Sequence, residues 1–383
     1  MSGKQVSAIV RYGVDEQGRL QLARTIIWPT LRTIPNHTHA SLQRTYTGIQ
    51  VPKITVDGAL VHDEFPYEIA FDGVLHIRSR TEQGLEVRRT LFPSTRKKAY
   101  IEKIELANKT SAAIRVAIER EGKIDTARGT KGIYLLEIEH DASEQCVLQP
   151  EGTLAYYVRY TGRKRMEPDV QVDGEEELSS RQALISRTQQ TLQLETPDPI
   201  LNRCFSLAKL RALESIYETD GGLMHSPGGG VFYAAVWTND QAEYAGPFFP
   251  YTGDPDAIEA SMNAYRLYMP FMGPDYTMLP ASIIAEGIDI WEGAGDRGDA
   301  AMYAYGATLF ALTRGDRLVA KELWPAIEWC LEYCRRQENE AGVIGSDSDE
   351  LEGRFPAGKA NLSTSALAYG AYVQASQLAV ALG

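Results

Sequence analysis

The sequence has no surplus of basic residues, few cysteines and no long run of apolar residues. Lys and Arg number 39 against 51 Asp and Glu, so the formal net charge is −12. Without a basic face, a protein that follows the phosphate backbone of a nucleic acid is excluded. No apolar run reaches about 18 residues, and the N-terminus lacks a signal-peptide core. The sequence therefore predicts a cytoplasmic protein with neither a nucleic-acid nor a membrane partner.

The four cysteines form no repeated C-x-x-C pattern, which argues against a zinc site. Neither a metal nor a cofactor is expected. Cys330 and Cys334 are four residues apart in a helical pattern, so we expect two buried thiols on one helix face. The composition is otherwise that of an ordinary globular protein, and the length of 383 residues favours two domains.

Residues 1–195 show the period of β-strands. Apolar and polar residues alternate within 84–93 and 100–108, and Asp72-Gly73 separates two short runs, which is a hairpin signal. Further strand-like runs are 18–28, 71–79, 112–120, 132–140, 154–162 and 189–195. The acidic run 175–180 is interpreted as a surface loop. Many short strands at regular spacing predict an N-terminal antiparallel β-sandwich over residues 1–195.

From residue 196 the period becomes helical, after a Thr-Pro-Asp-Pro breaker. The expected helices are 201–216, 240–250, 255–270, 297–313, 316–337 and 362–382. Helix 297–313 is apolar on nearly all sides and should be buried. Helix 316–337 is amphipathic and should lie outside it, with Pro325 breaking it or starting a turn. The six helices predict three hairpins of an α/α toroid over residues 196–383.

The long loops between these helices combine aromatic residues with carboxylates. They are 221–240, 271–296 and 338–364, and long ordered loops in a compact domain are usually functional. Aromatic faces stack on sugar rings, and carboxylates and Arg bind hydroxyl groups by charge-assisted hydrogen bonds. The candidate substrate-binding residues are Trp237, Asn239, Asp240, Glu243, Trp291, Glu292, Arg297 and Arg354.

Several of these candidates have a purely structural alternative. Asp240 could cap the helix that follows it, and Glu243 could lie on a solvated helix face. Trp291 could belong to the core. His225 has no metal-ligating partners in the sequence, so a structural role is favoured. A phosphate cradle at glycines 228–230 is disfavoured because no Gly-Lys-Ser/Thr follows them.

The order of β-sandwich, Thr-Pro-Asp-Pro linker and helical hairpins resembles the six-hairpin glycosidases, in which a supersandwich precedes an (α/α)6 barrel. The segment SPGGGVFYAAVWTND, residues 226–240, resembles the trehalase-type signature of a Pro-Gly-Gly stretch followed by aromatics, Trp and Asp. This resemblance implies that Trp237 and Asp240 bind the non-reducing sugar in the innermost subsite. The match is imperfect, because Thr238-Asn239 separates the Trp from the Asp and the arginine of the signature is replaced.

A second segment, SDSDELEGRF at 346–355, resembles the family segment in which the general acid precedes an arginine. The resemblance makes Asp349 or Glu350 the catalytic acid and Arg354 a sugar-binding arginine. The stretch 287–301 resembles a middle loop of the barrel, which implies that Glu292 and Arg297 line its wall. The family has six hairpins and its catalytic base lies in the later half, so we expect this chain to be a fragment or a half-toroid.

The leading functional hypothesis is an inverting, exo-acting glycosidase on oligosaccharides, with its acid in the 346–355 loop and its base outside this sequence. A glycoside phosphorylase, which needs a phosphate pocket, is one alternative. A non-catalytic carbohydrate-binding or scaffold protein is another. A half-toroid would expose an apolar flank, which favours a homo-oligomer.

Overall fold

The computed structural model describes residues 1–34, 40–49, 52–120, 122–219, 221–226, 235–284, 290–291 and 293–383. The chain divides into two compact units between Glu214 and Ser215. A β-rich unit is followed by a helical unit, which confirms the predicted class of a β-sandwich with a helical domain. The domain limits of 1–195 and 196–383 stay a prediction.

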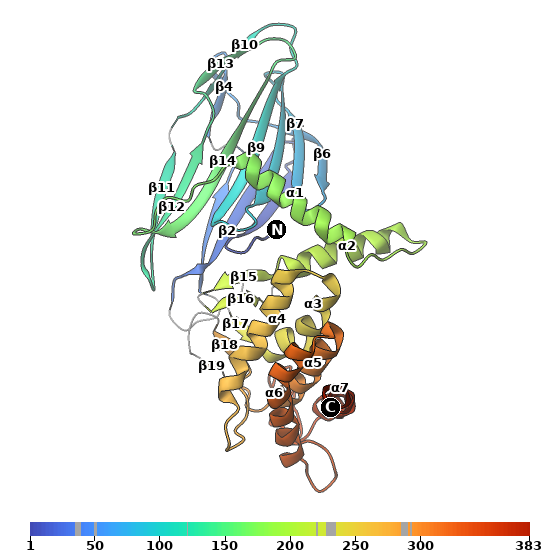
Figure 1. Ribbon diagram of the computed structural model, residues 1–383. Coiled ribbons are helices and arrows are strands. Elements are labelled where there is room, and N and C mark those ends of the chain that lie inside the picture. The colour runs from blue at the N-terminus through green and yellow to red at the C-terminus, as the bar shows by residue number, and fades with distance from the viewer. Residues whose placement is uncertain are drawn as a thin grey trace. The chain divides into compact units, whose positions relative to one another are not determined.

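The first unit holds fourteen strands among its described residues (Figure 1). They are β1 (Ser7–Val14), β2 (Leu20–Arg32), β3 (Ser41–Thr47), β4 (Ile54–Val56), β5 (Ala59–Leu60), β6 (Phe65–Phe71), β7 (Leu75–Arg80), β8 (Leu85–Pro93), β9 (Ala99–Asn108), β10 (Ile114–Ile118), β11 (Lys123–Gly129), β12 (Gly132–His140), β13 (Gln145–Leu148) and β14 (Thr153–Lys164). The sheet orders are β1-β2-β3, β13-β10-β4-β5 and β11-β12-β14-β9-β8-β7-β6, and neighbouring strands run antiparallel.

The sandwich core forms where the inward-facing residues of different sheets meet. Successive side chains of a strand point to opposite faces, so the alternation in β8 places Leu85, Val87 and Leu91 on one buried face. These residues share a core cluster with Ile26 and Trp28 of β2, which belongs to another sheet. The predicted Asp72-Gly73 turn is confirmed between β6 and β7.

Two sequence interpretations in this unit are wrong. The acidic run 175–180 is not a loop but the start of helix α1 (Gly174–Gln190), and the run 189–195 is not a strand. Asp173 caps α1 by accepting from the backbone N–H of Glu175 at 3.0 Å, and an acidic first turn suits the helix dipole. Leu178 and Ile185 of α1 then pack on strands β8 and β9, so burial of one helix face overrides the acidic composition.

Helix α2 (Pro199–Leu213) also belongs to the first compact unit, capped by Asp198. The second unit contains η1 (Thr238–Ala245), α3 (Gly246–Thr252), α4 (Pro255–Tyr268), η2 (Met269–Phe271), α5 (Asp299–Arg314), α6 (Arg317–Arg336) and α7 (Leu362–Leu382). Its short strands are β15 (Ile216–Thr219), β16 (Gly222–His225), β17 (Ala235–Trp237), β18 (Ser282–Ile284) and β19 (Ile290–Trp291). The arrangement of these helices as three hairpins of a six-hairpin α/α toroid stays a prediction.

Helix α5 is the inner helix of the second unit, as its composition predicts. It packs against α3, α6 and α7 (Figure 1). Most of its residues from Asp299 to Ala311 are buried. Cys330 and Cys334 lie buried on α6, as expected. The predicted break at Pro325 is wrong, because α6 runs through it. The carbonyl that loses its donor belongs to Lys321, an exposed residue, so water can hydrate it.

No helix among the described residues is both long and apolar enough to cross a bilayer.

Candidate functional site

The first element of the candidate site is η1, where the sequence predicted an α-helix over 240–250. Residues 238–245 instead form a π-helix, and its register is set by the backbone N–H of Gly246, which donates to the carbonyl of Gln241 five residues earlier. π-Helical turns are rare in proteins, and those that do occur often lie at functional sites. The turn carries two of the predicted site residues, Asp240 and Glu243.

No side chain caps the start of η1, and Gln241 instead fastens this start to β16. Its side-chain oxygen accepts from the backbone N–H of Trp237, and its nitrogen donates to the carbonyl of His225 at 2.6 Å. Burial lowers the pKa of His225 to about 4, so the imidazole is neutral and has the structural role expected of it. The Asp240 side chain is therefore free of the capping role that its position allowed.

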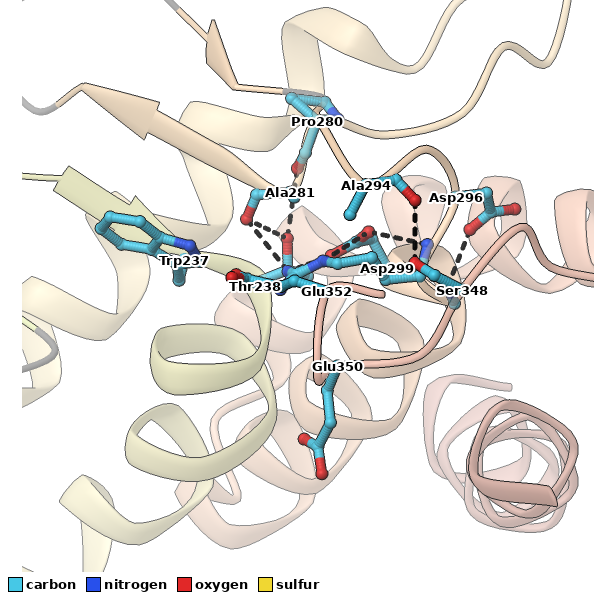
Figure 2. A network of polar contacts seen from close by, with 12 residues as sticks. Trp237, Thr238, Pro280, Ala281, Ala294, Asp296, Asp299, Ser348, Glu350 and Glu352 are labelled. Atoms are coloured by element: carbon cyan, nitrogen blue, oxygen red, sulfur yellow. Dashed lines mark hydrogen bonds and ion pairs between the residues drawn. The ribbon is translucent and has the colours of Figure 1, made fainter. Parts of the chain in front are cut away.

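A buried arginine joins η1 to the start of α5 and to the loop before α7. Arg297 donates to Asp299 at 2.7 Å, to Glu352 at 3.2 Å and to the carbonyl of Ala281 at 3.3 Å. Thr238 of η1 also donates to the Ala281 carbonyl, at 3.4 Å, so one backbone oxygen just before β18 holds both Thr238 and Arg297 (Figure 2). Arg297 is thus an internal anchor of the site.

Glu352 has a strained backbone conformation. Its φ of 61° lies in the left-handed region, which non-glycine residues rarely adopt. Such strain persists where surrounding contacts determine it and is concentrated at functional sites. Here the contact is the ion pair with Arg297, which is fully buried while Glu352 is half-buried.

Two carboxyl groups of η1 hold their protons at unusually high pH. Burial, with repulsion from Glu352 and Glu350, raises the pKa of Asp240 to about 6 against an attraction to Arg297. Burial, then repulsion from Glu350, raises the pKa of Glu243 to about 7. Among the described residues, Oε2 of Glu243 is buried with no hydrogen-bond partner, as is Oδ1 of Asn239. Unsatisfied buried acceptors of this kind are rare in folded proteins and mark η1 as unusual.

The loop before α7 places the two predicted catalytic acids differently. Glu350 projects away from the Arg297 network (Figure 2) and accepts a hydrogen bond from the hydroxyl of Tyr244 on η1. Asp349 instead accepts from the backbone N–H of Leu351 at 2.9 Å, which stabilises the local turn. Arg354 is 72% exposed and lies 3.5 Å from Glu352.

The same loop is fastened to the residues before α5. Asp296 accepts from the hydroxyl of Tyr333 at 2.7 Å, and its own backbone N–H donates to Asp347 at 2.9 Å. Ser348 donates to the carbonyl of Ala294 at 2.8 Å (Figure 2). These contacts fix the segment from which Glu350 and Glu352 project.

Six of the predicted site residues therefore come from three neighbouring elements of one unit. Trp237, Asn239, Asp240 and Glu243 begin or belong to η1, Arg297 precedes α5, and Glu350 lies on the loop before α7. Trp291 contributes backbone to β19, but its side chain and all of Glu292 lie outside the described residues, as do residues 227–234 of the glycine-rich segment.

The sequence places three further side chains of the cluster in the same loops but assigns them no site role, namely Tyr244, Asp299 and Glu352. All three belong to segments rich in aromatics and carboxylates, but no local pattern shows which of them faces Arg297 or Glu350. In the part of the chain that the structure describes, no group of three or more His, Cys, Asp or Glu could hold a metal ion.

No protein-family model and no curated protein matches this chain. Among solved structures it is similar to a bacterial glucoamylase complexed with acarbose, with 10% identity, a TM-score of 0.39, and coverage of 92% of this chain and 61% of that chain. It is also similar to a polysaccharide lyase, with 8% identity, a TM-score of 0.24, and coverage of 85% and 68%. The chain thus spans about three fifths of the glucoamylase. At this level of similarity, the chemistry of the site has to be inferred from its own geometry.

Proposed function

We propose that the cluster around Arg297 acts on a glycosidic bond, with Glu243 as the proton donor. The observation that supports this most strongly is the state of Glu243. Its carboxyl group is held partly out of water, its pKa is raised to about 7, and one oxygen has no partner among the described residues. A general acid must keep its proton near the working pH and must offer it to the leaving oxygen.

Glu350 is the second carboxyl group in this proposal. Its charge is the largest electrostatic contribution to the raised pKa of Glu243, and the Tyr244 hydroxyl donates to it. Glycoside cleavage requires two carboxyl groups in different protonation states, and environments that separate their pKa values assign the acid and its partner. The sequence-based assignment of the acid to Glu350 or Asp349 is the competing version of the same mechanism.

A sugar is the substrate class that fits the other groups. Trp237 is half-buried at the start of η1 and supplies an aromatic surface next to Asn239 and Asp240. Carboxylate and amide oxygens at this position can accept hydrogen bonds from ring hydroxyls, while the indole can stack on a ring face. The inverting and exo-acting details of the hypothesis, with an oligosaccharide as substrate, remain part of the proposal.

The test is the release of reducing ends by the full chain from a panel of neutral oligosaccharides and aryl glycosides. Glu243→Gln and Glu350→Gln are compared with Glu328→Gln, which changes an exposed glutamate of α6 in the same way. We expect the first two variants to lose about 100-fold or more in rate, a typical cost of removing an acid–base group. The control should keep the wild-type rate.

Three results would contradict the proposal. Full activity in both Glu243→Gln and Glu350→Gln would remove these residues from the chemistry. Turnover that requires inorganic phosphate would make the protein a phosphorylase. Saturable sugar binding by the wild-type protein without any turnover would make it a carbohydrate-binding protein.

A further inference from the structure

The carbonyl of Ala242, next to Glu243, has lost its place in the helical hydrogen-bond pattern. In η1 the N–H of Gly246 donates to the residue five positions earlier. The next donor in that register would be residue 247, but this is a proline and has no N–H. The Ala242 carbonyl therefore needs a donor from elsewhere, because a buried carbonyl without one costs free energy.

That donor is a buried side chain of a neighbouring helix. The hydroxyl of Tyr265 on α4 donates to the Ala242 carbonyl at 3.0 Å. Tyr265 is fully buried, and its ring contacts Tyr303 and Phe310 of α5, so its position is fixed by packing. The side-chain hydroxyl thus takes the role of the backbone N–H that Pro247 lacks.

The same carbonyl is also approached by a glycine of α5. A Cβ atom at Gly306 would lie 1.6 Å from the Ala242 oxygen and 3.0 Å from Cα of Glu243. Only a residue without a side chain permits this approach of two backbones. Gly246 is constrained in the same way, since its Cβ would lie 2.2 Å from the Tyr265 hydroxyl.

We propose that Tyr265 and Gly306 are positioning residues, which hold the π-turn so that the Glu243 carboxyl group stays in its half-buried place beside Glu350. Neither residue acts on substrate. They contact the backbone of residues 242 and 243, and through these contacts they stabilise the π-helical hydrogen-bond register of η1. This inference rests on the proposed function for its catalytic meaning, but its structural content can be tested without turnover.

The experiment compares Tyr265→Phe with Tyr303→Phe in the full chain. Both variants remove one hydroxyl from a fully buried tyrosine, and both hydroxyls donate to a backbone carbonyl, at 3.0 Å and 3.1 Å. The Tyr303 hydroxyl, however, donates to Tyr265 on α4 and not to η1. The control therefore carries the same loss of a buried hydrogen bond but keeps the hydroxyl that donates to the Ala242 carbonyl.

The readout is the titration of the Glu243 side chain, followed by NMR with ¹³C-labelled glutamate and assigned with Glu243→Gln. In Tyr265→Phe the turn can relax toward water, so the midpoint should fall from about 7 toward 4.5, by about one pH unit or more. Tyr303→Phe should leave the midpoint unchanged although the melting temperature falls in both variants. Gly306→Ala should move the midpoint further in the same direction if it folds.

Equal midpoints in the wild type and Tyr265→Phe, or equal shifts in both phenylalanine variants, would overturn the inference. Where the wild-type protein turns over a glycoside, the pH dependence of kcat/KM should move in parallel with the titration. A wild-type protein that cleaves no glycoside would refute the proposed function, whereas the NMR comparison would still decide whether Tyr265 positions Glu243.

Discussion

Replacing Glu243 by glutamine should change how the stability of the helical unit depends on pH. The pKa of Glu243 is raised by folding, so the folded protein binds this proton more tightly than the unfolded chain does. Its contribution to stability is then complete below the unfolded value of 4.5 and is lost as the pH rises through about 7. The glutamine side chain keeps the shape but carries no charge, so this loss should be absent from the variant.

The size of the effect follows from the same two values. Folding moves the pKa of Glu243 from 4.5 to about 7, and each pH unit is worth about 1.4 kcal/mol, which bounds the effect at roughly 3 kcal/mol. Because Glu243 is only half-buried, solvent screening reduces this bound to about 1–2 kcal/mol. Relative to wild type, Glu243→Gln should thus gain about 1–2 kcal/mol of unfolding free energy between about pH 5 and about pH 8.

Urea unfolding followed by tryptophan fluorescence measures this difference. Four of the five tryptophans lie in the helical unit, so the signal reports mainly on the unit that contains Glu243. Glu328→Gln is the matched control, since it removes an exposed carboxylate from the same unit. A wild-type protein and a Glu243→Gln variant whose unfolding free energies fall in parallel over this pH range would refute the reasoning.

Three other substitutions test the framework around the site. Glu102→Gln should destabilise the sandwich by about 3–5 kcal/mol in urea unfolding, because it leaves the buried Arg24 without its carboxylate. Arg297→Leu should lower the stability of the helical unit by a similar amount, about 3–5 kcal/mol, since Asp299 would stay buried and unpaired; a variant as stable as wild type would show that Arg297 is not an anchor. Asp173→Ala should cost only about 1 kcal/mol, the contribution of one helix cap, and unchanged unfolding would exclude the cap.

The sandwich could be predicted from the sequence because its signals are local. Alternation along a strand and a two-residue turn such as Asp72-Gly73 determine which face is buried before any partner is known. Helix α1 was missed because its acidic start resembles a surface loop, whereas burial of Leu178 and Ile185 against the sheet decides its structure. Pro325 was misjudged for a similar reason, since packing of α6 on both sides of it maintains the helix.

The site could be predicted only in outline. Aromatic and acidic residues beside helix starts indicated η1 and the loop before α7, but not the π-turn that carries Asp240 and Glu243. That turn follows from Pro247, Tyr265 and Gly306, three residues brought together by the tertiary structure and not by a motif. The family-like segment at 346–355 locates the loop before α7, but it does not show the environment of each side chain. Its sequence does not reveal that Arg354 is exposed or that Asp349 accepts a hydrogen bond within a local turn.

The pH dependence of kcat/KM for a cleaved glycoside tests the central claim most directly. If Glu243 donates the proton, the wild-type rate should fall on the alkaline side with a midpoint near the Glu243 pKa of about 7, as its carboxyl group loses its proton. Glu243→Gln should lose this limb together with most of the rate. A Glu243→Gln variant that keeps the wild-type rate and the same alkaline limb would contradict the account.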